Sequence, residues 1–459
     1  MGLPQRLRDT LKRHRIRRLY NAGKMAESRE KALEEVTLET TNLSMAMDIV
    51  IRSYYNQKKW NELLEFVEQY PESDHSNYAK RAKIKLASTI MYVEPKPVMY
   101  KNKEWDNQNL LENWYQEDQR LWLRHPGGWV YWDMPDGFLL EQTSSGLLHL
   151  ALEILLFPWI PEVKQWDAGL REPGSRLALS YSGGIDSTAA MLLLPDETLL
   201  AYHMRDFPSM LDHSIPKRTF QAVQEKMKRE VVCVPSNHER IRTNHGLKIG
   251  FSSSNAAGVH LILLADYFDL AGIAFGTPID NTWLKSGRTY RDFAQSPYWN
   301  YWEGQFSKAG LSYVLPINHI SEAGALEICK QSILSEAVNS CLRGVEGAWC
   351  GKCWKCFHKN GPLGRSIDPT SKEIMKFLNT KPLRTAQHAL WALKIQNLQY
   401  LTPQFSTYFE SDLSWWTEAF EPGLDLIQKP WREGIREKTS QYLEWMDSPY
   451  VLQNVCLDV

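Results

Sequence analysis

The spacing of apolar residues changes twice along the chain and predicts three kinds of region. Near the N-terminus, Trp60, Leu63, Leu64 and Val67 recur at helical spacing before Pro71. We therefore predict a helical region over residues 1–95. Further on, His125-Pro-Gly-Gly and Met134-Pro-Asp-Gly are turn signals on either side of Trp129-Val-Tyr-Trp. They predict a hairpin. We group this hairpin and an apolar helix predicted over 147–157 into a connecting region at 96–170.

From Arg176 onward, short apolar strands alternate with helical segments. This order predicts an α/β fold with a doubly wound, mostly parallel sheet, in which ligands bind at the carboxyl ends of the strands. We assign residues 171–335 to this domain, 336–366 to a four-cysteine zinc knuckle and 367–459 to a helical C-terminal region. The predicted strands are 177–180, 198–204, 231–234 and 272–276, and the predicted helices are 188–194, 217–229 and 255–268.

Charge and hydropathy limit the partners that we expect. The 53 Lys and Arg residues are balanced by 54 Asp and Glu residues, so no overall field attracts nucleic acid. The basic run from Arg6 to Arg18 is the exception, either as a solvated helix face or as a contact for nucleic acid or an acidic partner. No apolar run is long enough to span a membrane, and the start has no apolar signal core. We expect a cytoplasmic protein, although an Arg-rich start is also typical of organelle transit peptides.

The segment Ser182-Gly-Gly-Ile-Asp-Ser187 carries the most specific chemistry. It follows the predicted strand that ends at Ser180 and precedes a helix that begins near Thr188. Gly183 and Gly184 let the backbone turn sharply, and the N–H groups at the helix start favour an anion. The two serine hydroxyls can donate to phosphate oxygens, and Asp186 can hold Mg²⁺. The alternative is an ordinary Gly-Gly turn.

Four of the seven cysteines form a second motif. Cys341, Cys350, Cys353 and Cys356 follow the spacing Cys-x8-Cys-x2-Cys-x2-Cys. Four thiolates close a tetrahedral zinc shell, which makes such an ion structural and leaves no open catalytic position. An iron–sulfur cluster is the alternative, but ferredoxins continue with Cys-x3-Cys-Pro, whereas Phe357-His-Lys-Asn follows Cys356 here.

Taken together, the loop and the cysteines resemble a known family. Ser182–Ser187 with Thr188 is similar to the pyrophosphate loop of the N-type ATP pyrophosphatases, and no Walker Gly-Lys-Ser/Thr follows. Together with Ser340-Cys341 and Cys350-Gly-Lys-Cys353, the pattern over residues 176–366 resembles 7-cyano-7-deazaguanine synthase, the queuosine-precursor enzyme.

The resemblance implies an adenine nucleotide α-hydrolase-like fold and an ATP-dependent C–N ligase. Such an enzyme converts ATP to AMP and pyrophosphate, and so activates a carboxylated deazaguanine for attack by ammonia or an amine. ATP, Mg²⁺ and structural Zn²⁺ are the implied cofactors, and Asp186 and Ser187 the implied catalytic residues. The implied ATP-binding residues are Ser180, Ser182, Gly183, Gly184, Ile185, Asp186, Ser187, Thr188, Tyr202, His203 and Met204. The implied substrate-binding residues are Gly276, Thr277, Asp280, Trp283, Arg288 and Arg291.

Three positions depart from the family pattern. Thr289 stands where the family has an Asp that faces the deazapurine, and Glu322 stands where it has a Lys. Lys359 replaces an Arg after the last cysteine, which keeps the charge but loses the planar fork of the guanidinium. In the same stretch, Trp283, Trp299 and Trp302 either stack on a base-like ring or pack in the core.

Three functions are compatible with these features. The first is the adenylating enzyme, with a small carboxylated heterocycle and ammonia or an amine as its partners. The second is a tRNA-modifying pyrophosphate-loop enzyme such as a thiolase, supported by the basic start of the chain. The third is an inactive nucleotide-binding scaffold in which Glu322 has ended turnover. In each case the helical ends can hold protein partners, and a homodimer is compatible with the sequence.

Overall fold

The computed structural model describes residues 5–74, 77–87, 94–167, 171–207, 212–341 and 343–459. At its centre lies an eight-stranded sheet with the strand order β1-β2-β3-β6-β5-β4-β7-β10. A separate two-stranded hairpin is formed by β8 (Leu284–Lys285) and β9 (Thr289–Tyr290). The strands of the main sheet are β1 (Trp114–Glu117), β2 (Arg120–His125), β3 (Gly128–Asp133), β4 (Arg176–Ser180), β5 (Leu199–Arg205), β6 (Val231–Ser236), β7 (Leu270–Ala274) and β10 (Ser312–Val314).

Five strands of the sheet are parallel and three are antiparallel. β6, β5, β4 and β7 run parallel, as the alternation of strands and helices predicts, and β10, which is not among the predicted strands, pairs parallel with β7. The predicted hairpin is confirmed as β2 and β3. It does not stand apart, because β3 pairs antiparallel with β6 through Trp132 and Ser236 and so extends the main sheet. The fold is therefore α/β with a mostly parallel sheet.

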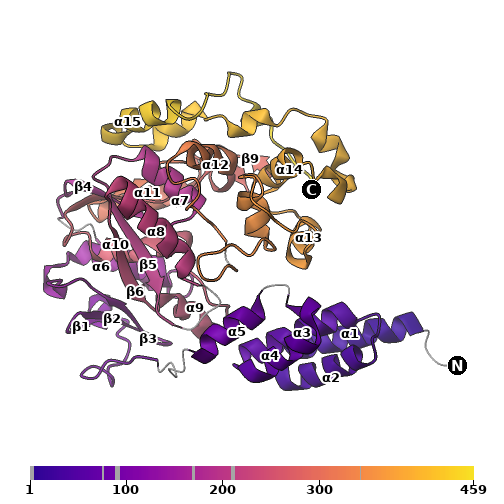
Figure 1. Ribbon diagram of the computed structural model, residues 1–459. Helices are drawn as coiled ribbons and strands as arrows, with labels where there is room; N and C mark the ends of the chain where they lie inside the picture. The colour runs from indigo at the N-terminus through magenta and orange to yellow at the C-terminus, as the bar shows by residue number, and fades with distance from the viewer. Residues whose placement is uncertain (1–4, 75–76, 88–93, 168–170, 208–211, 342) are drawn as a thin grey trace.

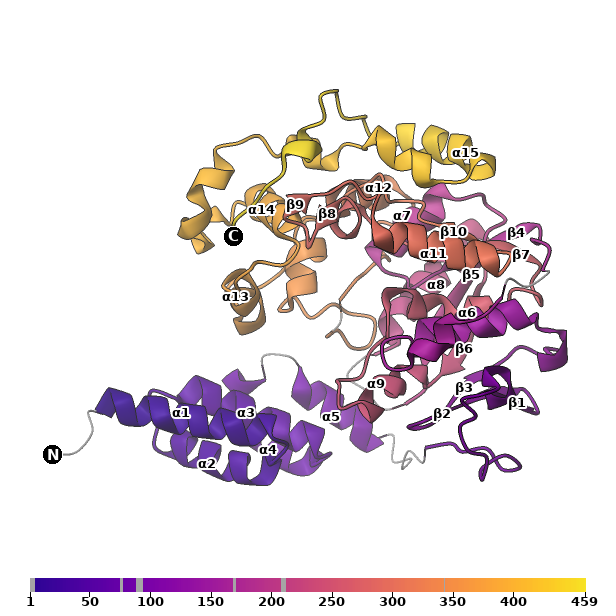
Figure 2. The ribbon, with the colours of Figure 1, turned by 180° about the vertical axis from the view of Figure 1, so that it is seen from behind.

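Helices cover both faces of the sheet. α7 (Ile185–Leu193) and α8 (Ser214–Met227) lie on the face towards the viewer in Figure 1. α6 (Ser145–Leu156) and α11 (Pro297–Lys308) lie on the other face, seen in Figure 2. Strand β4 is almost wholly apolar in its interior because both of its faces are buried.

One predicted helix on this sheet is shorter than expected. Instead of a helix over 255–268, the chain forms a 3-10 turn, Ser254–Gly258, followed by the short α10 (Val259–Leu263). A Cβ at Gly258 would lie 2.6 Å from the ring of Phe275, so the close contact with β7's end needs this glycine. Tertiary packing thus overrides the helical periodicity here. The short α9 (Ile241–Asn244) contacts β3.

The N-terminal helices form a bundle with its own apolar core, beside the sheet domain (Figures 1 and 2). They are α1 (Gln5–Asn21), α2 (Met25–Thr37), α3 (Leu43–Asn56), α4 (Trp60–Gln69) and α5 (Tyr78–Ala87). Polar contacts join the bundle to the rest of the chain. Lys80 Nζ lies 2.5 Å from Glu346 Oε2, and Lys372 Nζ lies 3.5 Å from Asp48 Oδ2.

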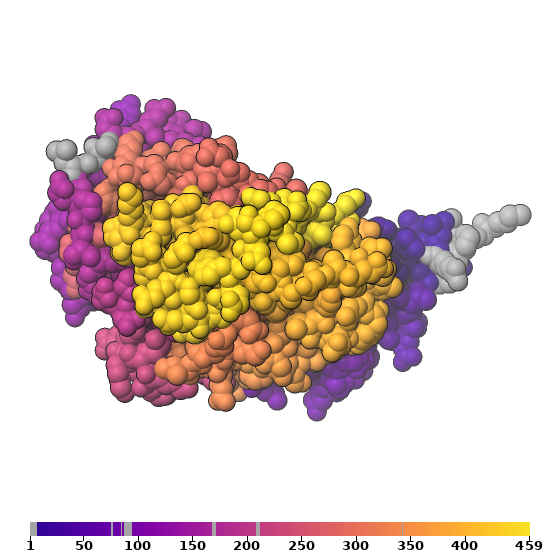
Figure 3. Space-filling view, turned by 90° about the horizontal axis from the view of Figure 1, so that it is seen from above, coloured from indigo at the N-terminus to yellow at the C-terminus, as the bar shows by residue number. Residues whose placement is uncertain are grey.

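The C-terminal region lies across the top of the sheet domain and is only partly helical (Figures 1 and 3). Its helices are α13 (Lys372–Leu378), α14 (Ala386–Ile395) and α15 (Lys429–Ser440), joined by 3-10 turns and irregular chain. α12 (Glu322–Gln331) precedes this region and packs against α7. Among the helices of the described residues, none is both long and apolar enough to cross a membrane.

Candidate functional site

The glycine-rich loop joins β4 to α7 at the carboxyl edge of the sheet. Gly183 has a φ of +70°, and a Cβ there would lie 3.0 Å from the ring of Phe220, so both conformation and space favour glycine. Ser182 and Ser187 Oγ atoms lie 3.0 Å apart. The loop thus presents two hydroxyls and the start of α7 on one side, an arrangement suited to an anion.

The end of β7 closes on this loop. A Cβ at Gly276 would lie 3.0 Å from the backbone of Asp186 and Ser187, so glycine is needed for the approach. Gly276 and Thr277 thereby lie beside the loop, as expected from two neighbouring parallel strands.

A cavity of about 720 Å³ opens above the loop. This is within the range of small-molecule sites. Most of the predicted ATP-binding residues, together with Gly276 and Thr277, contribute to its wall. The predicted residues that line it are Ser180, Ser182, Gly184, Asp186, Ser187, Tyr202, His203, Gly276, Thr277 and Cys341. Gly183, Ile185 and Thr188 shape the loop and the first turn of α7, and Met204 lies on β5 outside the lining.

The ion pair between Arg205, at the end of β5, and Glu239 forms part of the cavity wall. The guanidinium of Arg205 donates to Glu239, with Nε 2.9 Å from Oε1, and His203 Nε2 lies 3.1 Å from the same oxygen. Burial alone would raise the pKa of Glu239, but its bonds to His203 and Arg205 lower it to about 2. Glu239 is therefore ionised and holds both side chains in place. Phe251 also lines the cavity and offers a ring on which a flat ligand can stack.

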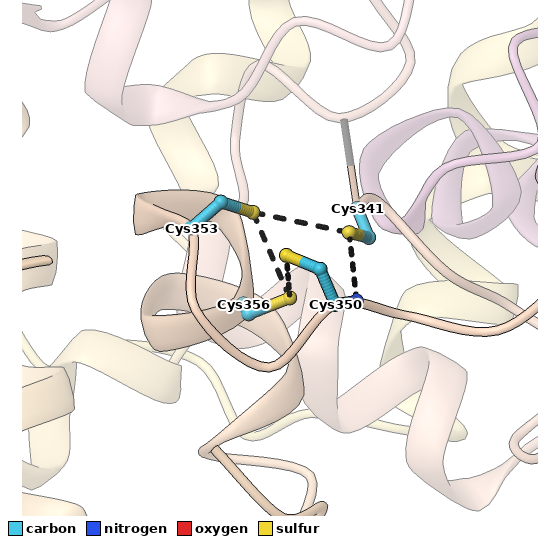
Figure 4. Close-up of side chains that lie close together, drawn as sticks. All are labelled: Cys341, Cys350, Cys353 and Cys356. Atoms are coloured by element: carbon cyan, nitrogen blue, oxygen red, sulfur yellow. Dashed lines mark hydrogen bonds between the residues drawn. The ribbon is translucent and has the colours of Figure 1, made fainter. Parts of the chain in front are cut away.

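The four cysteines converge into one cluster, as their spacing predicts (Figure 4). Sγ–Sγ distances are 3.9 Å for Cys341–Cys353, 3.8 Å for Cys350–Cys356 and 3.6 Å for Cys353–Cys356. Zn–S bonds of about 2.3 Å in a tetrahedron separate the sulfurs by about 3.8 Å, so the cluster has the right size for a metal such as zinc. The backbone N–H of Cys350 also points to Cys341 Sγ at 3.3 Å, which favours a thiolate.

The residue before this cluster joins it to the loop. Ser340 Oγ accepts the N–H of Ile185 at 2.9 Å, at the first turn of α7. Arg343 and Lys355 also line the cavity, and Arg343 Nε lies 3.4 Å from Glu373 Oε2. The cysteine cluster therefore positions part of the cavity wall and does not stand apart from it.

The remaining predicted substrate residues lie outside the cavity. Trp283 is 3% exposed, packs edge-on against Phe420 with ring centroids 5.1 Å apart, and donates to Asn318. Arg291 donates to the carbonyl groups of Thr282 and Asn281. Trp299 and Trp302 are buried on α11, which favours packing over base stacking.

The C-terminal chain explains this placement. It lies over the β8–β9 hairpin, where the N–H of Tyr290 donates to Val455 O and that of Leu457 donates to Arg288 O, both at 2.9 Å. The segment expected to face a substrate is thus covered by residues more than 160 positions further along.

Asp280 is also absent from the cavity wall and belongs to a buried cluster behind the loop. Its Oδ2 accepts the N–H of Glu322 at 2.8 Å, at the start of α12. Lys359 Nζ lies 2.6 Å from Asp186 Oδ1 and 2.9 Å from Glu322 Oε2. Burial alone would lower the pKa of Lys359, but the two carboxylates raise it, so the ammonium is retained. Burial and the nearby Glu322 raise the pKa of Asp280 well above its usual value.

Several cavity residues have no signal in the sequence. Arg205 ends strand β5, while Glu239 and Phe251 lie beyond β6 in stretches without a motif, and only their convergence reveals them. Lys359 and Glu322 could be noticed as departures from the family pattern. Their direct ion pair, which offsets the reversed charge at position 322, becomes visible only in three dimensions.

Comparison with known proteins matched one part of the chain to a family model. Residues 301–450 match the model of DUF6395, a family of unknown function. The match runs from α11 through the cysteine cluster and most of the C-terminal region, and it leaves out the glycine-rich loop. No curated protein and no solved structure matched the chain.

Proposed function

We propose that the protein binds ATP above Ser182–Ser187 and adenylates a carboxylated, deazaguanine-like heterocycle for attack by ammonia or an amine. The single observation that carries this proposal is the convergence of the loop, Gly276 and Ser340 on one cavity. Its volume of about 720 Å³ suits a nucleotide together with part of a second substrate.

The chain's own groups fit the two chemical steps. The loop hydroxyls and the start of α7 would bind the phosphates, while Arg343 and Lys355 would offset their charge. The substrate carboxylate would attack the α-phosphorus, so the bond to the β-phosphate oxygen breaks and pyrophosphate leaves. Ammonia or an amine would then attack the acyl carbon, lose a proton and release AMP.

Two metal ions belong to this proposal, one in the cavity and one at the four cysteines. Asp186 lines the cavity, and its side chain is 23% exposed. Its Oδ1 contacts Lys359, and the carboxylate would also share Mg²⁺ with phosphate oxygens. That ion would neutralise phosphate charge. We assign Zn²⁺ to the four cysteines, where a closed thiolate shell has a structural role.

The test is release of pyrophosphate and AMP from ATP with a panel of carboxylated deazapurines and ammonium. We expect Asp186→Asn to lower the rate by at least about 100-fold, because the carboxylate that would hold Mg²⁺ against the phosphates is lost. Asp425→Asn, on the exposed side of the C-terminal region, is the matched control and should keep the rate. Absence of pyrophosphate with every substrate would reject the proposed reaction.

The exposed surface of α1 favours one second candidate, a tRNA-modifying enzyme. Arg8, Arg15, Arg17 and Arg18 are exposed on this helix. Binding of tRNA that weakens steeply with added salt would support it. Sulfur transfer has less support, because Cys341 is the one cysteine among the described residues that line the cavity, and it belongs to the four-cysteine cluster.

A further inference from the structure

A second group of metal-ligand side chains lies buried behind the glycine-rich loop. It consists of Glu322 at the start of α12, His358 in the turn after the last cysteine, and His388 on α14. The two histidines are 0% exposed and Glu322 is 4% exposed. Three segments distant in sequence thus bring two imidazoles and one carboxylate together.

The distances are close to those of a metal shell. Glu322 Oε2 lies 3.8 Å from His358 Nδ1 and 3.9 Å from His388 Nε2. Ligand atoms of a tetrahedral site with bonds of about 2.1 Å are about 3.4 Å apart. The two distances from Glu322 exceed this value by a few tenths of an ångström, and the three ligand atoms all lie within 4.8 Å of one another, so a cation would draw the side chains together.

Polar nitrogen atoms in this group lack partners. Within the described part of the chain, neither ring nitrogen of His358 has a hydrogen bond, and His388 Nδ1 has none. His388 Nε2 donates to His358 O at 3.0 Å, a bond that metal binding through this nitrogen would replace. Buried polar atoms are nearly always satisfied in proteins, so several free ones in one place indicate a bound water or ion.

The charges around the group are compatible with a bound cation, although the raised pKa of Asp280 also allows that carboxyl group to stay protonated. Asp186, Glu322 and Asp280 place three carboxyl groups near the ammonium of Lys359. With all three ionised, a divalent cation would bring the sum to zero. Burying unbalanced charge is costly, so either a carboxyl group is protonated or a cation is bound.

We propose that Glu322, His358 and His388 form a second metal site that takes a divalent first-row transition cation, with zinc as the representative ion. Imidazole and carboxylate ligands suit zinc, and they also suit iron and manganese. This site is separate from the four cysteines and does not depend on the proposed reaction. A bound cation would hold α14 and α12 together behind Asp186, and Lys359 would lie between the cation's carboxylate ligand and the loop.

Metal content of the full-length protein tests the proposal. We expect two zinc ions per chain after equilibration with zinc and gel filtration, measured by elemental analysis. His388→Gln and Glu322→Gln should each reduce this to one. His319→Gln is the matched control, because His319 is equally buried but lies outside the group, and it should keep two. One ion per chain in the unmodified protein, or two retained in both site variants, would overturn the proposal.

Cobalt substitution of the unmodified protein gives an answer even if the variants fail to fold. Cobalt at the four cysteines produces intense thiolate charge-transfer bands, whereas cobalt bound by nitrogen and oxygen gives only weak visible bands. We expect both signatures, at one cobalt each per chain. A spectrum and stoichiometry that contain the thiolate-bound cobalt alone would refute the second site.

Discussion

Two segments at the same edge of the sheet have opposite surroundings. The loop after β4 faces a cavity, whereas the segment after β7 that contains Trp283 and Arg291 lies beneath the C-terminal chain. Both follow parallel strands, so the topology alone would place both near a ligand. Gly276 and Thr277, directly after β7, line the cavity, so the difference shows that a segment further from the strand end joins a site only when no distant segment covers it.

The largest effect should come from the cysteine cluster, which supports the cavity side. Cys353→Ser should remove the metal that we propose for this cluster and leave the second proposed site occupied; metal binding is coupled to folding by on the order of 10 kcal/mol in small zinc domains. Ser340 would then lose its position against Ile185, and binding of ATP would fall with it. Elemental analysis and ATP titration measure both losses. Cys233→Ser alters an exposed thiol and should change neither quantity. If Cys353→Ser kept the metal content and the ATP affinity of the unmodified protein, the cluster would not support the cavity wall.

The second-largest effect is a loss of stability on removal of the Lys359 ammonium, which lies behind the glycine-rich loop. Lys359→Met leaves Asp186 and Glu322 without their cation, and breaking a buried ion pair costs about 3–5 kcal/mol. We expect this loss in the free energy of unfolding from urea titration. Lys330→Met is the matched control on α12, since its pair with Glu327 is at the surface and contributes less than about 1 kcal/mol. Equal losses in the two variants would contradict the buried-pair interpretation.

Acid should weaken the cavity wall through Glu239. Its pKa is lowered from 4.5 to about 2, so its ionised form stabilises the fold above pH 4.5 and this contribution disappears as the pH falls towards 2. The contribution is on the order of 3 kcal/mol. Glu239→Gln should therefore be less stable at neutral pH and lose less stability than the unmodified protein between pH 4.5 and 2. Urea midpoints across this range measure it, with the exposed Glu410→Gln as control. Identical pH profiles for the unmodified protein and Glu239→Gln would be evidence against the ion pair.

The smallest effects compare one aromatic residue from each segment. Trp283→Phe removes the donor to Asn318 and should cost about 1 kcal/mol of stability, while ATP affinity stays within about two-fold. Phe251→Leu, in the cavity wall, should instead weaken ATP binding by about 1 kcal/mol through lost stacking. Calorimetry with ATP and thermal unfolding measure both. A loss of ATP affinity confined to Trp283→Phe would reverse our assignment of the two segments.

The sequence by itself determined the local features. Period and turn signals predicted the alternating strands and helices, the β2–β3 hairpin and the helix α4, because each depends on residues close together in the chain. The Ser182–Ser187 loop and the spacing of the four cysteines are local in the same sense. Both motifs lie where their residues predict, after a buried strand and within one cluster.

Only the tertiary structure decided which residues share a site. Glu239 and Arg205 become part of the cavity because β5 and the chain after β6 converge. Trp283 does not line the cavity, because the C-terminal chain covers the β8–β9 hairpin beside it. Glu322 contacts Lys359 and lies close to His358 and His388, which come from separate segments of the chain. Such contacts depend on long-range packing and on the cost of burying charge, neither of which leaves a periodic signal in the sequence.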